Sequence, residues 1–156
     1  MKQEKIASFV DIVKNYFAQF PQKELIVDTP YLSDDKKPHV YDYTGVIGIS
    51  GIMKGVVYVS ASRALLLELL QDMQESNNTE AMLVDLIGEI ANTVAGNARR
   101  EFGADFHIST PFMFKGLPEA VILPNEGRAF IIPIIWQQAS GEIVVCLEEV
   151  LSLIHI

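Results

Sequence analysis

Two carboxylates and an amide lie close together within residues 85–97, which read DLIGEIANTVAGN. A carboxylate can pair with a cation, and an amide can both donate and accept hydrogen bonds and so orient a water molecule. Glu89 and Asn92 are three residues apart, which makes their side chains neighbours if the segment is helical. The segment therefore holds a candidate pair for positioning or binding chemistry.

The same segment has the periodicity of an amphipathic helix. At about 100° per residue, Asp85, Glu89, Asn92 and Gly96 fall within one stripe, and apolar side chains occupy the opposite side. We expect the apolar side to pack and the polar stripe to face a partner. Gly96, with Gly88 on the flank, leaves room there for another backbone or a bulky ligand.

Other polar residues of this helix have different expected roles. Asp85 lies within the first two turns, where a negative charge also favours the helix dipole, so we assign it a supporting role. Asn97 falls near the edge of the apolar arc, at about 120° on the wheel, and we expect a structural role with internal hydrogen bonds. Arg99 and Arg100 lie at the rim, where they could pair with carboxylates of another protein; we expect them to stay solvated.

The elements that must position this helix follow from hydrophobic periodicity and turn residues. We expect an α+β fold in two layers, with a mainly antiparallel sheet and about three helices gathered on one face. Asn77 and Glu80 resemble a capping box for the long helix, and Gly103 supplies its stop. The expected helices are 2–20, 62–73 and the long helix to 102, and the expected strands are 25–27, 41–50, 55–61, 106–110, 120–124, 129–137 and 142–147, with turns at 51–54, 125–127 and 139–141.

Length and composition bound the class of protein. The 156 residues, 49% of them hydrophobic, are enough for one domain, which we take as 1–156. A net charge of -8 disfavours nucleic acid and anionic membranes as partners. No stretch approaches the ~18 apolar residues of a membrane span, and the N-terminus lacks the pattern of a signal peptide. With a single cysteine as well, we expect a cytoplasmic chain.

Motifs for metal binding and nucleophilic catalysis are not recognisable in the sequence. The three histidines have no second histidine or carboxylate at ligand spacing, so we expect no metal site on this chain. Gly45 and Gly48 lie inside a β-rich run and precede no helix, which does not fit a phosphate-binding loop. The polar stripe from Asp85 is the remaining candidate site.

The block GEIANTVAGNA, which begins at Gly88, resembles the signature helix of the CheC/CheX family of chemotaxis phosphatases, and CheX most closely. That signature has an acidic or serine residue, a glutamate three residues before an asparagine, and a later proline. Pro111 is the candidate for the proline, at a spacing somewhat shorter than expected. CheC-type members repeat the Glu-x-x-Asn pair on an earlier helix, where this chain offers only Asp11 and Asn15. One pair per chain therefore favours CheX.

The resemblance implies a phosphatase that acts on a phosphorylated CheY-type response regulator in chemotaxis. Asn92 would orient the attacking water and Glu89 would pair with the regulator's active-site lysine. The regulator would hold the Mg²⁺, and this chain would carry no cofactor. The family precedent implies a homodimer joined through sheet edges. The alternative is a non-catalytic dimeric domain that only docks a response regulator or a switch component. An enzyme for small phosphate esters is disfavoured, because the acidic chain offers no cationic clamp.

Overall fold

The computed structural model describes residues 3–21, 23–33, 40–116 and 129–150. Within these ranges the chain forms three helices and eight strands around one sheet. In chain order they are α1 (Gln3–Ala18), β1 (Leu25–Val27), β2 (Tyr31–Leu32), β3 (Tyr43–Gly51), β4 (Met53–Ala61), α2 (Arg63–Asp72), α3 (Glu80–Phe102), β5 (Phe106–Ile108), β6 (Phe112–Lys115), β7 (Phe130–Trp136) and β8 (Ala139–Glu149).

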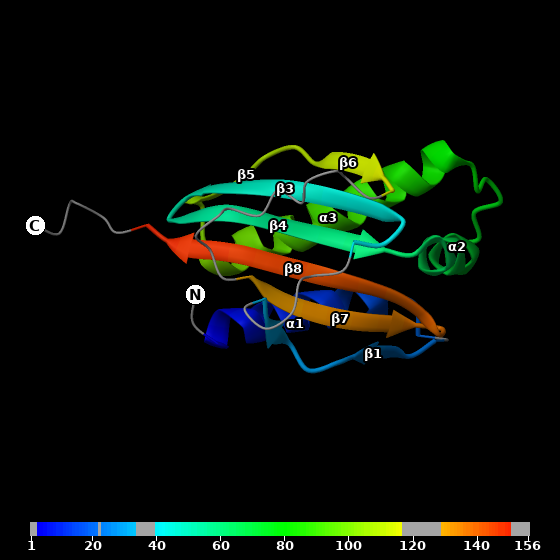
Figure 1. The fold of residues 1–156 in the computed structure, drawn as a ribbon, viewed down its shortest axis with the longest axis horizontal. Coiled ribbons are helices and arrows are strands. Elements are labelled where there is room, and N and C mark those ends of the chain that lie inside the picture. The colour runs from blue at the N-terminus through cyan, green and yellow to red at the C-terminus, as the bar shows by residue number, and fades with distance from the viewer. Residues whose placement is uncertain (1–2, 22, 34–39, 117–128, 151–156) are drawn as a thin grey trace, which may run out of the picture.

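All the strand pairs of this sheet are antiparallel. The strand order is β1-β7-β8-β4-β3-β5, with β2 also paired to β7 and β6 also paired to β3. Helices α1 and α3 lie behind this sheet in Figure 1, and α2 lies at one end, next to the start of α3. The α+β architecture expected from the sequence, with the helices on one side of an antiparallel sheet, is therefore confirmed.

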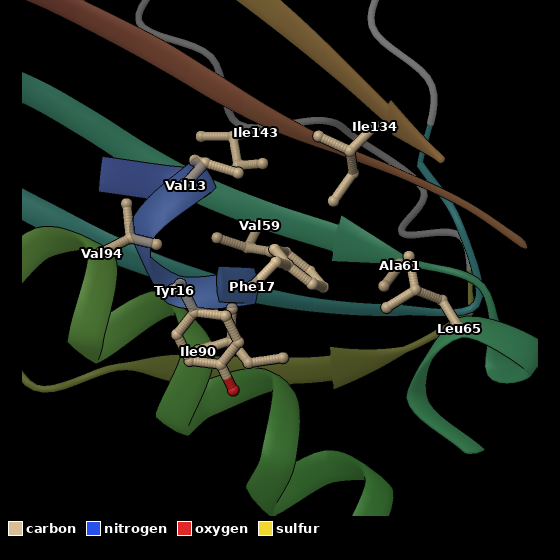
Figure 2. Close-up of a pocket in the computed structure, with 10 residues that line it drawn as sticks. All are labelled: Val13, Tyr16, Phe17, Val59, Ala61, Leu65, Ile90, Val94, Ile134 and Ile143. Carbon is tan, nitrogen blue, oxygen red and sulfur yellow. The ribbon is translucent and has the colours of Figure 1, made fainter. Parts of the chain in front are cut away.

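The core fills the space between the helices and the sheet. Figure 2 shows side chains of α1, α2 and α3 gathered over side chains of the central strands, among them Phe17, Leu65, Ile90, Val59 and Ile143. Only about 10 Å³ of space remains among them, and its lining is apolar. Because a space of this size is no larger than one water molecule, it has no room for a ligand.

Helix α3 lies directly on β3 because β3 carries a glycine at the contact. A Cβ added to Gly45 would come within 2.8 Å of the backbone oxygen of Ile87 and 3.1 Å of the Cβ of Ala91. The glycine thus allows the backbone of the helix to approach the strand closely. This contact fixes the depth of α3 on the sheet.

The ends of α3 differ in part from expectation. The N-cap is Thr79, whose side chain accepts a hydrogen bond from the backbone N–H of Met82 at 3.3 Å. The capping box expected at Asn77 and Glu80 is wrong, because Asn77 instead accepts a bond from the backbone N–H of Thr79 at 3.2 Å. Gly103 ends the helix with a φ of 104°, as expected. The Thr79 side chain therefore caps the N-terminal end of α3, and Gly103 ends the helix at its C-terminus.

Some strands and turns were also misplaced. The turn expected at 139–141 lies at Gln137 and Gln138, whose φ angles are 50° and 66°. Ala139 already pairs with Trp136 in β8. The turn expected at 51–54 is narrower, because β3 extends to Gly51 and β4 begins at Met53. Strand β6 was not expected at all, and the strand expected at 120–124 and the turn at 125–127 lie outside the described residues.

Candidate functional site

The polar stripe expected on α3 is present on the surface of the molecule. Asp85, Glu89 and Asn92 are exposed, whereas Leu86 and Ile90 on the other side of the helix are buried. Within the described part of the chain, none of the three polar side chains has a hydrogen-bond or ion-pair partner. Their carboxylate and amide groups are therefore available to a molecule that approaches from solvent.

The glycines of α3 have two different environments. A Cβ added to Gly96 would meet no atom within 4 Å, so the surface is open one turn beyond Asn92. Gly88 is buried, and a Cβ there would lie 2.7 Å from the Sδ atom of Met113 in β6. The expectation that Gly88 gives clearance to a partner is therefore revised: it makes room for β6 instead.

Asn97 lies between the exposed and the buried sides of α3. It is half-buried, and its Oδ1 atom accepts a hydrogen bond from Nη1 of Arg100 at 3.5 Å. The internal bond expected for Asn97 is therefore made along the helix, to a neighbour one turn on. This position leaves it outside the stripe of Asn92.

Two elements border the exposed stripe. On one side Tyr16 of α1 is buried, and its burial, together with the nearby negative charge of Glu89, raises the pKa of its hydroxyl. On the other side β6 lies along the helix through the contact of Met113 with Gly88. Pro111, the candidate proline of the signature, precedes β6 directly. The exposed stripe thus lies between α1 and β6, and we call it the ridge.

An ionic cluster fixes the N-terminal end of this ridge. The Glu80 carboxylate accepts hydrogen bonds from the Tyr43 hydroxyl and the Arg63 guanidinium, and Lys115 lies 3.4 Å away. These residues belong to α3, β3, α2 and β6, so the cluster joins four elements. The bonds from Tyr43, then Arg63 and then Lys115, lower the pKa of Glu80 to about 2. Sequence reasoning missed this cluster because its members are far apart in the chain.

We expect the Glu80 cluster to contribute stability that is lost in acid. The pKa of the Glu80 carboxyl is lowered in the folded chain. The contribution of the cluster to the free energy of unfolding is therefore fully present at a pH above the ordinary carboxyl pKa near 4.5, and it disappears as the pH falls towards about 2. Glu80→Gln should therefore destabilise the chain near pH 6 and have a much smaller effect near pH 2. Urea unfolding of the parent chain and of Glu80→Gln at the two pH values measures their free energies of unfolding. A difference in stability between the two chains that is equal at both pH values would contradict the prediction.

No metal site is found among the residues that the structure describes. No group of three or more histidine, cysteine, aspartate or glutamate side chains is arranged there to hold an ion. Among the same residues, no helix is long and apolar enough to cross a membrane.

Solved structures of chemotaxis proteins are similar to this chain over most of its length. A chemotactic CheC-like protein from Shewanella oneidensis MR-1 is 27% identical, with a TM-score of 0.82 over 95% of this chain and 100% of that chain. The chemotaxis protein CheX from Vibrio vulnificus is 28% identical, with a TM-score of 0.78 over 93% of this chain and 99% of that chain. A CheX-CheY-BeF3-Mg complex from Borrelia burgdorferi contains a chain of the same fold, at 18% identity and a TM-score of 0.76 over 92% of this chain and 97% of that chain.

The family follows from the sequence itself. Residues 43–135 match the family model described as chemotaxis phosphatase CheX, and this chain belongs to that family. The matched region runs from the start of β3 to one residue before the end of β7, and it contains the whole of α3 with its exposed stripe. No curated protein matches the chain.

Proposed function

We propose that this chain accelerates the dephosphorylation of a phosphorylated CheY-type response regulator in chemotaxis. The observation that carries the proposal is the pair Glu89 and Asn92 on the ridge of a chain that belongs to the CheX family; both side chains are exposed and have no partner among the described residues. A Borrelia burgdorferi protein of this fold forms a CheX-CheY complex. In the proposal the ridge enters the regulator's active site, and the chain acts in the cytoplasm.

Asn92 has the chemistry that this reaction needs. Catalysis of phosphoryl transfer depends mainly on positioning the reactants and on stabilising charge, because the protein itself takes little part in the covalent chemistry. The regulator would supply the aspartyl phosphate and a Mg²⁺ ion that neutralises its charge, and this chain would need no cofactor. The amide would accept a hydrogen bond from a water molecule and hold it in line with the phosphorus.

Glu89 would fix the register of the two proteins. Its carboxylate is exposed three residues before Asn92, so both side chains can reach the same partner. Pairing with the regulator's active-site lysine would orient Asn92 over the phosphate, since charged pairs at an interface mainly set specificity and register. Asp85, exposed one turn earlier, would support this contact through its negative charge.

The open surface at Gly96 leads to a prediction for the docked complex. Gly96→Leu should stabilise the free chain by about 0.8 kcal/mol, because leucine is the better helix former, and the added Cβ meets no atom within 4 Å. The same side chain should weaken binding of the phosphorylated regulator by about tenfold or more, because it fills the clearance that the partner needs. Isothermal titration calorimetry measures the affinity. The control is Glu101→Leu, which adds the same side chain away from the ridge, and equal losses in the two variants would contradict the prediction.

We also propose that the chain forms a homodimer through a sheet edge. One edge carries the short strands β1 and β2 with Pro30 between them, features that hinder strand pairing. The other edge carries β6, where Phe112 is 64% exposed and its ring contacts that of Phe114. The edge at β6 is therefore the better candidate for pairing with a second copy, and sedimentation of the Phe112→Lys variant tests it.

Mixing the chain with phosphorylated response regulators from the same genome tests the proposed function. The decay of each phosphorylated regulator is followed with and without the chain, and a faster decay of at least one regulator is expected. Binding of a phosphorylated regulator without any faster decay would instead favour the alternative, a non-catalytic dimeric domain that docks a regulator or a switch component.

A further inference from the structure

Two arginines continue the exposed ridge beyond the candidate site. Asn92, Gly96 and Arg99 are spaced i, i+4 and i+7 on α3, so they lie along one line of the helix surface. Arg99 and Arg100 are both exposed in the last turn of the helix. On the helical wheel Arg100 falls about 20° from Glu89. Both guanidinium groups therefore project from the same side of the molecule as the candidate site.

These arginines differ from most other cations of the described residues in having no carboxylate partner. Arg99 forms no ion pair there, and the Arg100 guanidinium donates only to the Asn97 amide, at 3.5 Å. The cations that do pair with carboxylates are Lys5, Lys23, Arg63 and Lys115. In a chain with a net charge of -8, the end of α3 thus presents two cations that have no carboxylate partner among the described residues. Such a patch attracts an acidic partner surface.

The distance from Asn92 decides what the patch can bind. Seven residues of helix separate Arg99 from Asn92, a rise of about 10 Å. Beyond the region of the partner that contacts Asn92, a second region of the same partner protein therefore lies against the arginines. The clearance at Gly96, between the two positions, lets one continuous surface cover both.

We propose that Arg99 and Arg100 form a docking site for an acidic side chain on the surface of the phosphorylated regulator, about 10 Å from its phosphoryl group. This proposal rests on the proposed function of the ridge. The arginines contribute to encounter and affinity, because charged pairs at an interface mainly set association and register. Their attraction is exposed to solvent and is therefore screened by salt.

The steady-state kinetics of regulator dephosphorylation test this docking site. Arg99→Gln with Arg100→Gln should raise KM about tenfold at low salt, since each exposed pair contributes up to about fivefold, and should leave kcat within about twofold. The salt dependence of kcat/KM should become shallower in this double variant. Replacing both arginines by lysine should restore most of the affinity, because the charge is retained. The control is Lys54→Gln, a loss of one exposed cation on β4, which should leave KM unchanged.

Two results would overturn the docking site. A lower melting temperature with unchanged KM would mean that the arginines only stabilise the negative end of the helix dipole. A fall in kcat at unchanged KM would also contradict the assignment. If the unmodified chain does not accelerate dephosphorylation, the proposed function fails; the affinity of the phosphorylated regulator for the unmodified chain and the double variant then decides separately whether the patch docks it.

Discussion

Replacing Asn92 with alanine is expected to abolish most of the acceleration of regulator dephosphorylation, by about a hundredfold or more, as for loss of a positioning group. The side chain is exposed and has no partner within the described residues, so its removal leaves the core intact. Alanine is also the better helix former, so the variant should be up to about 0.7 kcal/mol more stable than the parent. A loss of activity together with a gain of stability separates a chemical role from a structural one.

The control for this experiment is Asn15→Ala on α1. Asn15 is also an exposed asparagine on a helix, but no Glu-x-x-Asn pair surrounds it. Its replacement should leave the rate of dephosphorylation unchanged. Phosphate loss from the regulator and denaturant unfolding are measured for both variants. Full activity of Asn92→Ala, or equal losses in the two variants, would contradict the assigned role of Asn92.

Reversing the charge of Glu89 is expected to have the second largest effect. In Glu89→Lys the new cation would face the regulator's lysine, and like charges brought together at an interface cost several kcal/mol. We therefore expect affinity for the phosphorylated regulator to fall by about a hundredfold or more. Asp85→Lys makes the same change of charge one turn earlier and should have a smaller effect, because Asp85 only supports the contact.

A double-mutant cycle identifies the partner of Glu89. Changing the regulator's active-site lysine to glutamate should restore part of the affinity of Glu89→Lys, because opposite charges then face each other again. Calorimetry gives the four binding constants. If the two changes are simply additive, Glu89 does not contact that lysine.

The sequence predicted the structure best where a single helical repeat of apolar residues continues through a long segment. The 23 residues of α3 repeat the helical spacing often enough to predict both its buried side and its exposed stripe. Strand β6 was missed because it has only four residues, Phe112–Lys115, and forms through pairing with β3, far away in the sequence. The turn at Gln137 and Gln138 has positive φ angles without glycine or asparagine, so the usual turn signals pointed to a site two residues later.

In the candidate site, too, the features that lie within one helix were predicted from the sequence, and the contacts between distant segments were not. The spacing of Glu89 and Asn92 predicted that they share a surface, because both lie on one helix. The burial of Gly88 depends on Met113, which is 25 residues further along the chain, and the Glu80 cluster draws on three other elements. Contacts of this kind depend on tertiary packing and leave no periodic pattern in the sequence.

Phosphate release with the regulator in excess decides whether Asn92 makes this chain a catalyst. A phosphorylated regulator is mixed with about one tenth as much of the chain, and the phosphate released above the regulator's own decay is measured. We expect several equivalents of phosphate per chain, and almost none with Asn92→Ala. Release that stays at the regulator's own rate with the unmodified chain, for every regulator that binds it, would contradict the proposed phosphatase activity.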